Sequence, residues 1–142
     1  MGSDYVVDGS VALKWLIDDE ADIPRARTIL SDILSGNARL LVPPHYVSEV
    51  GNGLIMAARR KRIVSDRLME AWADFLSIPR VETPWHPLLD TQTFELARDS
   101  SLTYYDAAYV ALTAMHRASF MTADNQAAET AQRMNLRVTL LR

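Results

Sequence analysis

The sequence of 142 residues contains no cysteine, which excludes disulfide bridges, thiolate nucleophiles and zinc sites with cysteine ligands. Its three histidines do not share a metal-binding spacing such as H-x-x-x-H. Basic residues are not in excess either, because 15 Lys and Arg stand against 18 Asp and Glu. A general polyanion binder usually has a strongly basic balance, so the composition argues against that class of protein.

Long apolar runs are also missing. No stretch approaches the roughly 18 residues that a membrane span requires, and the N-terminus lacks the basic region and uninterrupted apolar stretch of a signal peptide. We therefore expect a cytoplasmic protein without a membrane segment. No repeat or linker divides the chain, so residues 1–142 are expected to form one domain. Met1-Gly2-Ser3 resembles a cloning remnant and is given no structural weight.

Short runs of β-branched and apolar residues alternate along the chain with longer segments of helical pattern. The expected strands are residues 5–7, 40–42, 80–83, 119–122 and 137–141, and the expected helices are residues 10–17, 24–34, 46–60, 65–76, 88–99, 104–117 and 126–134. Strands that alternate with helices predict an α/β fold, in which a central parallel sheet is covered by helices on both faces.

Four acidic residues fall where such a fold binds its ligands, just after a strand or at the start of the next helix. Asp8 follows the first strand, and Asp124 stands two residues beyond the fourth strand. Glu49 and Asp106 lie near the starts of two predicted helices. Each acid also has a structural alternative, because the backbone dipole favours acids in first helical turns and as N-terminal caps. For Glu49 and Asp124 that capping interpretation stays open.

Asp106 and Asp8 are harder to explain as caps, because their sequence neighbours are apolar. Asp106 is the only charged residue within 102–115, a segment that is apolar or neutral almost all round and is therefore expected to be buried. Asp8 is flanked by valines, and the only lysine near it in sequence is Lys14. A buried carboxylate must be paired, protonated or bound to a cation, because burying it bare costs several kcal/mol.

Acids that converge on one edge of a sheet repel one another, and a divalent cation relieves that repulsion. Ligand sets made only of oxygen suit Mg²⁺ or Mn²⁺, and one or two such ions can activate water for phosphodiester cleavage. Ser10, two residues after Asp8, is a candidate partner for an acid or for the scissile phosphate. Its alternative role is to cap the following helix. The residues alone thus predict an acidic site for a divalent cation.

Four motifs, in their order along the chain, resemble one known family. They are Val6-Val7-Asp8-Gly9-Ser10, Ser48-Glu49, Leu102-Thr103-Tyr104-Tyr105-Asp106-Ala107-Ala108-Tyr109-Val110-Ala111-Leu112 and Thr122-Ala123-Asp124. Together they resemble the PIN domain, and more narrowly the VapC-type toxin nucleases of prokaryotic type II toxin–antitoxin systems. The likeness extends from Asp4 to Leu141, and the motif around Asp106 is the most specific of the four.

The resemblance implies a Rossmann-like parallel sheet of about five strands in the order 3-2-1-4-5. It implies an endoribonuclease that depends on Mg²⁺ or Mn²⁺, with tRNA or rRNA as substrate, an antitoxin of VapB type as partner and a homodimer as the assembly. Residue by residue, the catalytic and metal-binding acids of the family fall on Asp8, Glu49, Asp106 and Asp124. Ser10 and Thr122 match its small polar positions and are candidate substrate-binding residues.

Arg59-Arg60-Lys61-Arg62 is the only dense basic run in the sequence. A run of this kind is typical of a solvated helix end, where the dipole favours cations. The alternative is that Arg59, Arg60 and Arg62 contact RNA phosphates or the acids of an antitoxin. In the proline-bracketed segment that follows, Trp85 and His86 either stack on a base or pack against the sheet edge.

Two other function classes share the length, the acids and the expected topology. A phosphoacceptor receiver domain carries a lysine at the end of its last strand, and this chain has no lysine after Lys61. A PIN-like subunit that binds RNA or a partner without cutting is the second class. The presence of all four acids argues against that alternative, so a metal-dependent ribonuclease is the main prediction.

Overall fold

The computed structural model describes residues 3–84 and 86–142. Trp85, for which base stacking or packing was suggested, lies outside the described residues. Within the described part of the chain, no helix has the length and apolar character that crossing a membrane requires.

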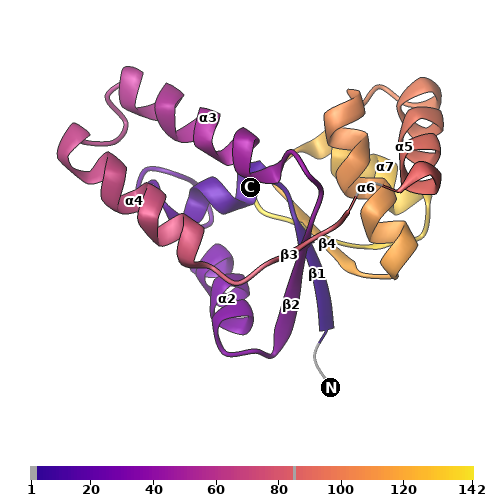
Figure 1. Cartoon of the computed structure of the whole chain (residues 1–142), viewed down its shortest axis with the longest axis horizontal. Helices are drawn as coiled ribbons and strands as arrows, with labels where there is room; N and C mark the ends of the chain where they lie inside the picture. The colour runs from indigo at the N-terminus through magenta and orange to yellow at the C-terminus, as the bar shows by residue number, and fades with distance from the viewer. Residues whose placement is uncertain (1–2, 85) are drawn as a thin grey trace.

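The centre of the molecule is a sheet of five parallel strands in the order β3-β2-β1-β4-β5 (Figure 1). The strands are β1 (Ser3–Val7), β2 (Ala38–Val42), β3 (Val81–Glu82), β4 (Ser119–Thr122) and β5 (Arg137–Leu140). This confirms the α/β class and the strand order predicted from the sequence. Ser3 belongs to the sheet, since it pairs with Ala38 and its N–H donates to the carbonyl of Asn37 at 3.1 Å. Giving no structural weight to residue 3 was therefore wrong.

Helices cover both faces of the sheet. They are α1 (Gly9–Ala12), the short 3-10 helix η1 (Leu13–Trp15), α2 (Ile23–Leu34), α3 (Tyr46–Arg59), α4 (Ser65–Ser77), α5 (Pro87–Asp99), α6 (Tyr104–His116) and α7 (Asn125–Arg133). Figure 1 shows α2, α3 and α4 on one side of the strands and α5, α6 and α7 on the other. The connections thus change sides between β1 and β4, and ligands of open α/β sheets bind at such a point.

The predicted elements agree with the observed ones to within two residues, apart from the first helix. That helix was predicted over residues 10–17, but it consists of one α-helical turn followed by η1. The helix begins at Gly9 because the Asp8 carboxylate caps it, accepting hydrogen bonds from the backbone N–H groups of Ser10 and Val11. The expectation that Ser10 caps this helix is therefore wrong, and Asp8 is the cap.

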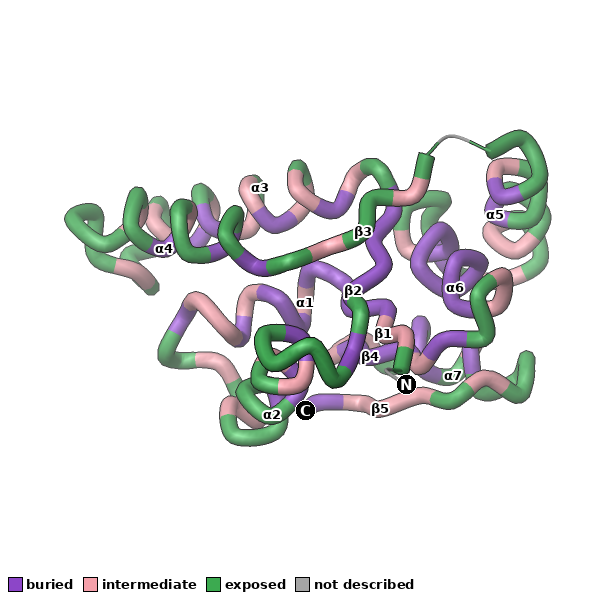
Figure 2. The backbone as a smooth tube through the Cα atoms, turned by 60° about the horizontal axis from the view of Figure 1, so that its bottom comes forward, coloured by how far each residue is buried: buried purple, intermediate pink, exposed green. Residues whose placement is uncertain are grey.

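The core extends over both faces of the central strands, and α6 is the most completely buried helix of the described residues. Val6 and Val7 of β1 and Phe120 of β4 are fully buried, and residues 107–113 of α6 are buried without interruption. Figure 2 shows this burial along β1, β4 and α6, with green exposed stretches on α4 and on the outer side of α5. Because α6 packs on β1 and β4, its first turn is fixed close to the carboxyl ends of these strands.

Candidate active site

Asp8 stands where β1, the central strand, gives way to α1. Its carboxylate accepts hydrogen bonds from the backbone N–H of Ser10 at 3.1 Å and from the hydroxyl of Thr122 at 2.5 Å. The Ser10 hydroxyl donates to it as well. Lys14, the nearest lysine in sequence, is buried elsewhere and donates to the carbonyl of Ala21 at 2.6 Å. The predicted burial of Asp8 is thus correct, and neutral groups satisfy the carboxylate.

Burial has a direct effect on the protonation of Asp8, which is only 7% exposed. Loss of solvation raises the pKa of this carboxyl to about 6, although its hydrogen bonds to Ser10, Thr122 and Val11 act in the opposite direction. The negative charge of Asp106 raises the pKa further. No Lys or Arg of the described residues forms an ion pair with Asp8.

Ser10 in α1 and Thr122 at the end of β4 support Asp8 from two different elements. Thr122 is fully buried, and its hydroxyl donates to Asp8 while accepting the backbone N–H of Asp124 at 3.0 Å. The Ser10 oxygen donates to Asp8 and accepts the backbone N–H of Ala123 at 3.0 Å. These hydroxyls join the end of β1 to the end of β4. Both hydroxyls are engaged within the protein, so the predicted contact of Ser10 and Thr122 with substrate stays a prediction.

Glu49, in the first turn of α3, reaches back toward β1. Its Oε1 accepts the backbone N–H of Gly9 at 3.0 Å, and its Oε2 accepts the hydroxyl of Tyr109 at 3.2 Å. His45 Nε2 lies 3.7 Å from the same Oε2, and burial lowers the pKa of His45, so this imidazole is neutral at neutral pH. Burial also raises the pKa of Glu49 to about 7, and the charges of Asp8 and Asp106 add to that rise.

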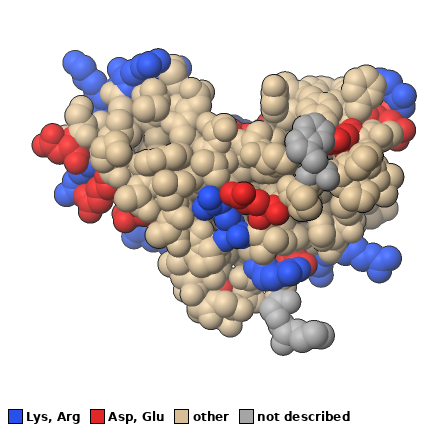
Figure 3. Space-filling view, in the orientation of Figure 1, with Lys and Arg blue, Asp and Glu red and all other residues tan. Residues whose placement is uncertain are grey.

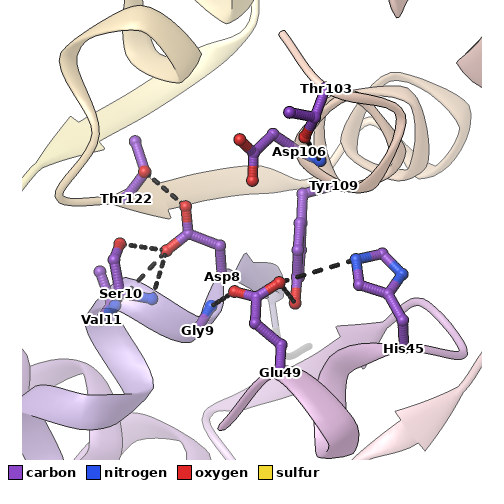
Figure 4. A network of polar contacts seen from close by, with 10 residues as sticks. All are labelled: Asp8, Gly9, Ser10, Val11, His45, Glu49, Thr103, Asp106, Tyr109 and Thr122. Atoms are coloured by element: carbon purple, nitrogen blue, oxygen red, sulfur yellow. Dashed lines mark hydrogen bonds and ion pairs between the residues drawn. The ribbon is translucent and has the colours of Figure 1, made fainter. Parts of the chain in front are cut away.

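Asp106 lies in the first turn of α6, which Thr103 caps by accepting the backbone N–H of Asp106 at 3.1 Å. The sequence suggested that Asp106 itself would be buried, but the side chain is at the edge of the core and half-buried. The reason is its position, because the fully buried part of α6 begins one residue later at Ala107. Figure 4 shows Asp106 extending from α6 toward the side of the site that holds Asp8 and Thr122.

Asp124 follows β4 and caps α7, where its carboxylate accepts the backbone N–H of Gln126 at 2.9 Å. The capping alternative for this residue is therefore correct. Its connection to the other acids runs through the backbone, since its N–H donates to Thr122 and Thr122 donates to Asp8. The charge of Asp106 raises the pKa of Asp8, and the charges of Asp8 and Asp106 raise that of Glu49.

The donor chemistry of this site fits a hard divalent cation, because all four predicted ligands are carboxylates. In residues 3–84 and 86–142, however, no group of three or more Asp, Glu or His side chains is arranged so that it could hold a metal ion as it stands. The hydrogen bonds give the reason. Asp8 and Glu49 are held by protein donors and Asp124 by its helix cap, so these carboxylates would have to turn in order to share an ion.

The basic run lies away from these acids, at the opposite end of α3. Glu49 and Arg59 are ten residues apart on one helix, which corresponds to about 15 Å along its axis. Arg62 forms ion pairs with Asp19 at 2.9 Å and with Glu20 at 2.8 Å. Arg59 and Arg60 are exposed, and Figure 3 shows Lys and Arg side chains on the outer edge where α3 meets α4. This arrangement favours the interpretation of the basic run as a solvated helix end over the interpretation that it contacts a ligand at the acidic site.

Two residues of the site were missed as functional positions in the sequence. A Cβ atom on Gly9 would come within 2.2 Å of Glu49 Oε1, so only glycine allows Glu49 to approach the backbone here. Tyr109 lies three residues after Asp106 on α6, and Figure 4 shows its ring reaching down to the Glu49 carboxylate. The spacing of Asp106 and Tyr109, about one helical turn, could have placed both on the same face.

Three solved structures illustrate which proteins have the same fold. The chain is similar to VapBC2 from Rickettsia felis bound to a promoter DNA fragment (TM-score 0.68, 12% identity, 98% of this chain and 99% of the other covered). It is also similar to FitAcB from Neisseria gonorrhoeae (TM-score 0.60, 16% identity, 94% and 95% covered). A third is the Sarcin-Ricin loop cleaving toxin VapC20 of Mycobacterium tuberculosis (TM-score 0.56, 17% identity, 78% and 82% covered).

At these identities the structural matches establish a shared fold. A search of curated proteins gives no match. The model of one family, the PIN domain, matches residues 5–133, which is nearly the whole chain and contains all four predicted acids. The sequence motifs, the strand order and the carboxylates at the switch point of the sheet agree with this match. The protein belongs to the PIN domain family.

Proposed function

We propose that the protein is an endoribonuclease that hydrolyses RNA phosphodiester bonds with Mg²⁺ or Mn²⁺, and that it is the toxin of a toxin–antitoxin pair. The observation that carries this proposal is the convergence of Asp8, Glu49 and Asp106, from the end of β1 and the first turns of α3 and α6, on one site. Burial and repulsion from neighbouring acids raise the pKa values of Asp8 and Glu49, and no lysine or arginine of the described residues pairs with either. Uncompensated acids at the carboxyl edge of a parallel sheet are typical of a divalent cation site.

The residues of the site have distinct roles in this reaction. Asp8 and Asp106 hold the cation, and Asp124 joins them when its carboxylate leaves the cap of α7. Glu49 completes the ligand set or orients the attacking water. Ser10 and Thr122 keep Asp8 in place through their hydroxyl groups. A bound Mg²⁺ or Mn²⁺ would neutralise the charge of the phosphate and lower the pKa of water.

RNA is the proposed substrate, with tRNA or rRNA as the class. Membership of the PIN family supports nuclease activity, and the fold shared with VapC20, a Sarcin-Ricin loop cleaving toxin, supports RNA as the target. The net charge of -3 does not contradict this substrate. If four of the 18 acidic residues bind metal, 14 acidic residues remain to offset the charge of the 15 basic ones.

The proposed partner is an antitoxin of VapB type, encoded by a small neighbouring gene. Structures with the same fold include toxin–antitoxin complexes, which supports such a partner. A groove of about 600 Å³ between α2 and α4 is a candidate surface for this partner, since its lining combines apolar residues, among them the exposed Leu34 and Val64, with charged ones such as Arg67 and Glu70. Exposed apolar side chains rimmed by charged ones are typical of a protein-binding face. The homodimer expected for VapC-like proteins stays a prediction.

The test is cleavage of RNA by the purified protein. We expect cleavage with millimolar Mg²⁺ or Mn²⁺, no cleavage with EDTA, and a loss of about a hundredfold or more in Asp106→Asn. Asp66→Asn is the matched control, because Asp66 is also a first-turn acid, on α4 and away from the site. This control variant should cleave at the rate of the unchanged protein.

Metal binding can be measured apart from activity. Mg²⁺ should raise the melting temperature of the unchanged protein and of Asp66→Asn, and it should raise that of Asp106→Asn less. An Asp106→Asn protein that cleaves at the normal rate would contradict the assignment of the acids. Absence of cleavage together with clear metal-dependent stabilisation would favour a PIN-like subunit that binds without cutting.

A further inference from the structure

A small cavity lies beside the acidic site, between the first turn of α6, the start of α5 and the residues that follow β2 and β3. Its volume is about 150 Å³, and its walls include Pro43, Pro44, Leu89, Tyr104 and Tyr105. A cavity of this size accommodates one six-membered aromatic ring. Proline and tyrosine side chains offer flat apolar faces against which such a ring can pack.

The cavity is continuous with the residues of the site. His45 lines it and also lies 3.7 Å from Glu49 Oε2, so a single side chain separates the cavity from that carboxylate. The imidazole packs edge-on against Tyr105 at 5.4 Å and against Tyr109 at 5.1 Å between ring centroids. Tyr105 is 63% exposed and immediately precedes Asp106. A ring held here would therefore belong to a group next to the reacting bond.

The polar groups of the cavity restrict what it can hold. Asp90, in the first turn of α5, is the one acidic residue among the described residues that line the cavity, and no Lys or Arg is among them. The rest of this lining is mostly apolar. The charge of Asp90, after burial, raises the pKa of the Tyr104 hydroxyl, so the two side chains lie near each other. A carboxylate beside an apolar cavity repels phosphate and accepts hydrogen bonds from N–H groups. The cavity therefore suits an uncharged ring with an amino donor.

We propose that this cavity holds one unpaired pyrimidine of the RNA, next to the scissile phosphate, and that Asp90 selects cytosine over uracil. The proposal rests on the ribonuclease function proposed above. Cytosine presents an exocyclic amino group, from which a carboxylate can accept a hydrogen bond. Uracil presents an oxygen at the same position, which a carboxylate repels. Stacking of single-stranded bases on tyrosine is a general mode of RNA recognition, and it supports a role for Tyr105.

The test measures binding of two fluorescent RNA octamers, oligocytidylate and oligouridylate, by anisotropy, with Ca²⁺ in place of Mg²⁺. The full-length protein should bind oligocytidylate about tenfold more tightly, the difference expected for a hydrogen bond to a charged group. Asp90→Asn should bind the two within about twofold of each other, because an amide can pair with either pyrimidine. Asp66→Asn, another first-turn acid, should keep the tenfold preference. Tyr105→Ala should weaken binding of both octamers by about tenfold.

Cleavage of a random RNA pool, read by sequencing the ends, provides a second measurement. Cytosine should be enriched beside the cut in the unchanged protein and not in Asp90→Asn. A cytosine preference that survives Asp90→Asn, or equal binding of the two octamers by the unchanged protein, would overturn the proposal. A Tyr105→Ala protein that binds both octamers normally but has a different molar mass by light scattering would also overturn the proposal, because a second copy of the chain would then fill the cavity. If the octamer preference holds but no RNA is cut, the nuclease proposal fails and the base site remains.

Discussion

The two ends of α3 carry opposite charges and differ in how these charges are compensated. At its start, Glu49 shares the site with Asp8 and Asp106, and it contacts the backbone of Gly9, the hydroxyl of Tyr109 and the imidazole of His45. Beyond its end, Arg62 is paired with Asp19 and Glu20. Acids that are buried together have raised pKa values, whereas the arginine at the exposed end has its pKa raised by its acidic partners.

This difference separates a functional site from a structural contact. The ion pairs of Arg62 join the turn after α3 to the segment before α2, and they place opposite charges in direct contact. The carboxylates of the acidic site oppose one another, which costs stability and persists only if the surrounding fold imposes it. Strained groups of this kind are typical of sites whose ligand removes the strain. Each prediction below changes one side of this comparison.

The largest effect is expected from Gly9→Ala. The new methyl group would lie 2.2 Å from Glu49 Oε1, so Glu49 must move away and lose its bond to the backbone. We expect RNA cleavage to fall by about a hundredfold, as a displaced site group can cause, and the free energy of unfolding to fall by about 1–3 kcal/mol. Cleavage assays and urea unfolding measure the two effects.

Gly51→Ala is the control for that substitution. Its methyl group would meet the ring of Trp72 at 3.2 Å, in the packing of α3 and away from the acids. This variant should lose some stability and keep its cleavage rate. Normal cleavage by Gly9→Ala would mean that the close approach of Glu49 to the backbone has no role in the reaction.

The second prediction concerns stability and pH in the absence of metal. In the folded protein the pKa of Asp8 is about 6 and that of Glu49 about 7, whereas the ordinary pKa values of these side chains are 3.8 and 4.5. The folded state thus binds more protons than the unfolded chain in this window, so the free energy of unfolding falls as pH rises from about 4 to about 7. The contribution of Asp8 is about 3 kcal/mol.

Glu49→Gln tests this pH dependence in EDTA. The amide oxygen can still accept the N–H of Gly9, but the charge opposite Asp8 is gone. The variant should therefore be more stable than the unchanged protein at pH 8 and equal to it near pH 4. Glu129→Gln, on the exposed face of α7, should leave the slope of stability against pH as it was. A rise of stability with pH from 4 to 7 would show that the acids are not in conflict.

A smaller effect is expected from Tyr109→Phe. The substitution removes one hydrogen bond to Glu49, of 3.2 Å, and keeps the aromatic ring against His45. We expect cleavage to fall by about three- to tenfold, in line with about 1 kcal/mol for such a bond. Tyr5→Phe is the matched control, since the Tyr5 hydroxyl donates to Asp32 at 2.9 Å on α2. Equal rates in both variants would remove Tyr109 from the site.

Most of the fold could be predicted from the sequence, because the spacing of hydrophobic residues and the positions of turn residues are features of short stretches of the chain. The alternation of short strands with longer helices was sufficient for the α/β class, and the family resemblance supplied the strand order. The first helix was predicted wrongly, since its form depends on which side chain caps it. Asp8 and Ser10 are both good caps by type, and only the path of the chain between β1 and β4 decides that Asp8 is the cap.

The site was predictable in its acids and not in its supporting contacts. Asp8, Glu49 and Asp106 come together as topology predicts, because parallel strands end at one edge of the sheet. The hydrogen bond from the Tyr109 hydroxyl to Glu49 joins positions 60 residues apart, and no local sequence pattern predicts such a contact. Burial was predicted for both Asp8 and Asp106, and the prediction is correct for only one of them. It holds for Asp8, whereas Asp106 lies one residue before the buried part of α6.

The smallest effect is expected at the basic run, where Arg62→Gln and Arg59→Gln form a matched pair. Arg62 has two acidic partners, so its loss should lower the free energy of unfolding by at most about 1 kcal/mol, the usual range for exposed ion pairs. Arg59 forms no ion pair with the described residues, and its loss should leave stability unchanged. If the run is a solvated helix end, both variants bind RNA with an unchanged dependence on salt. If these arginines contact phosphates, each substitution reduces the slope of log affinity against log salt by about one. The salt dependence of RNA binding thus decides whether the paired Arg62 and the unpaired Arg59 act on the same substrate as the acidic site.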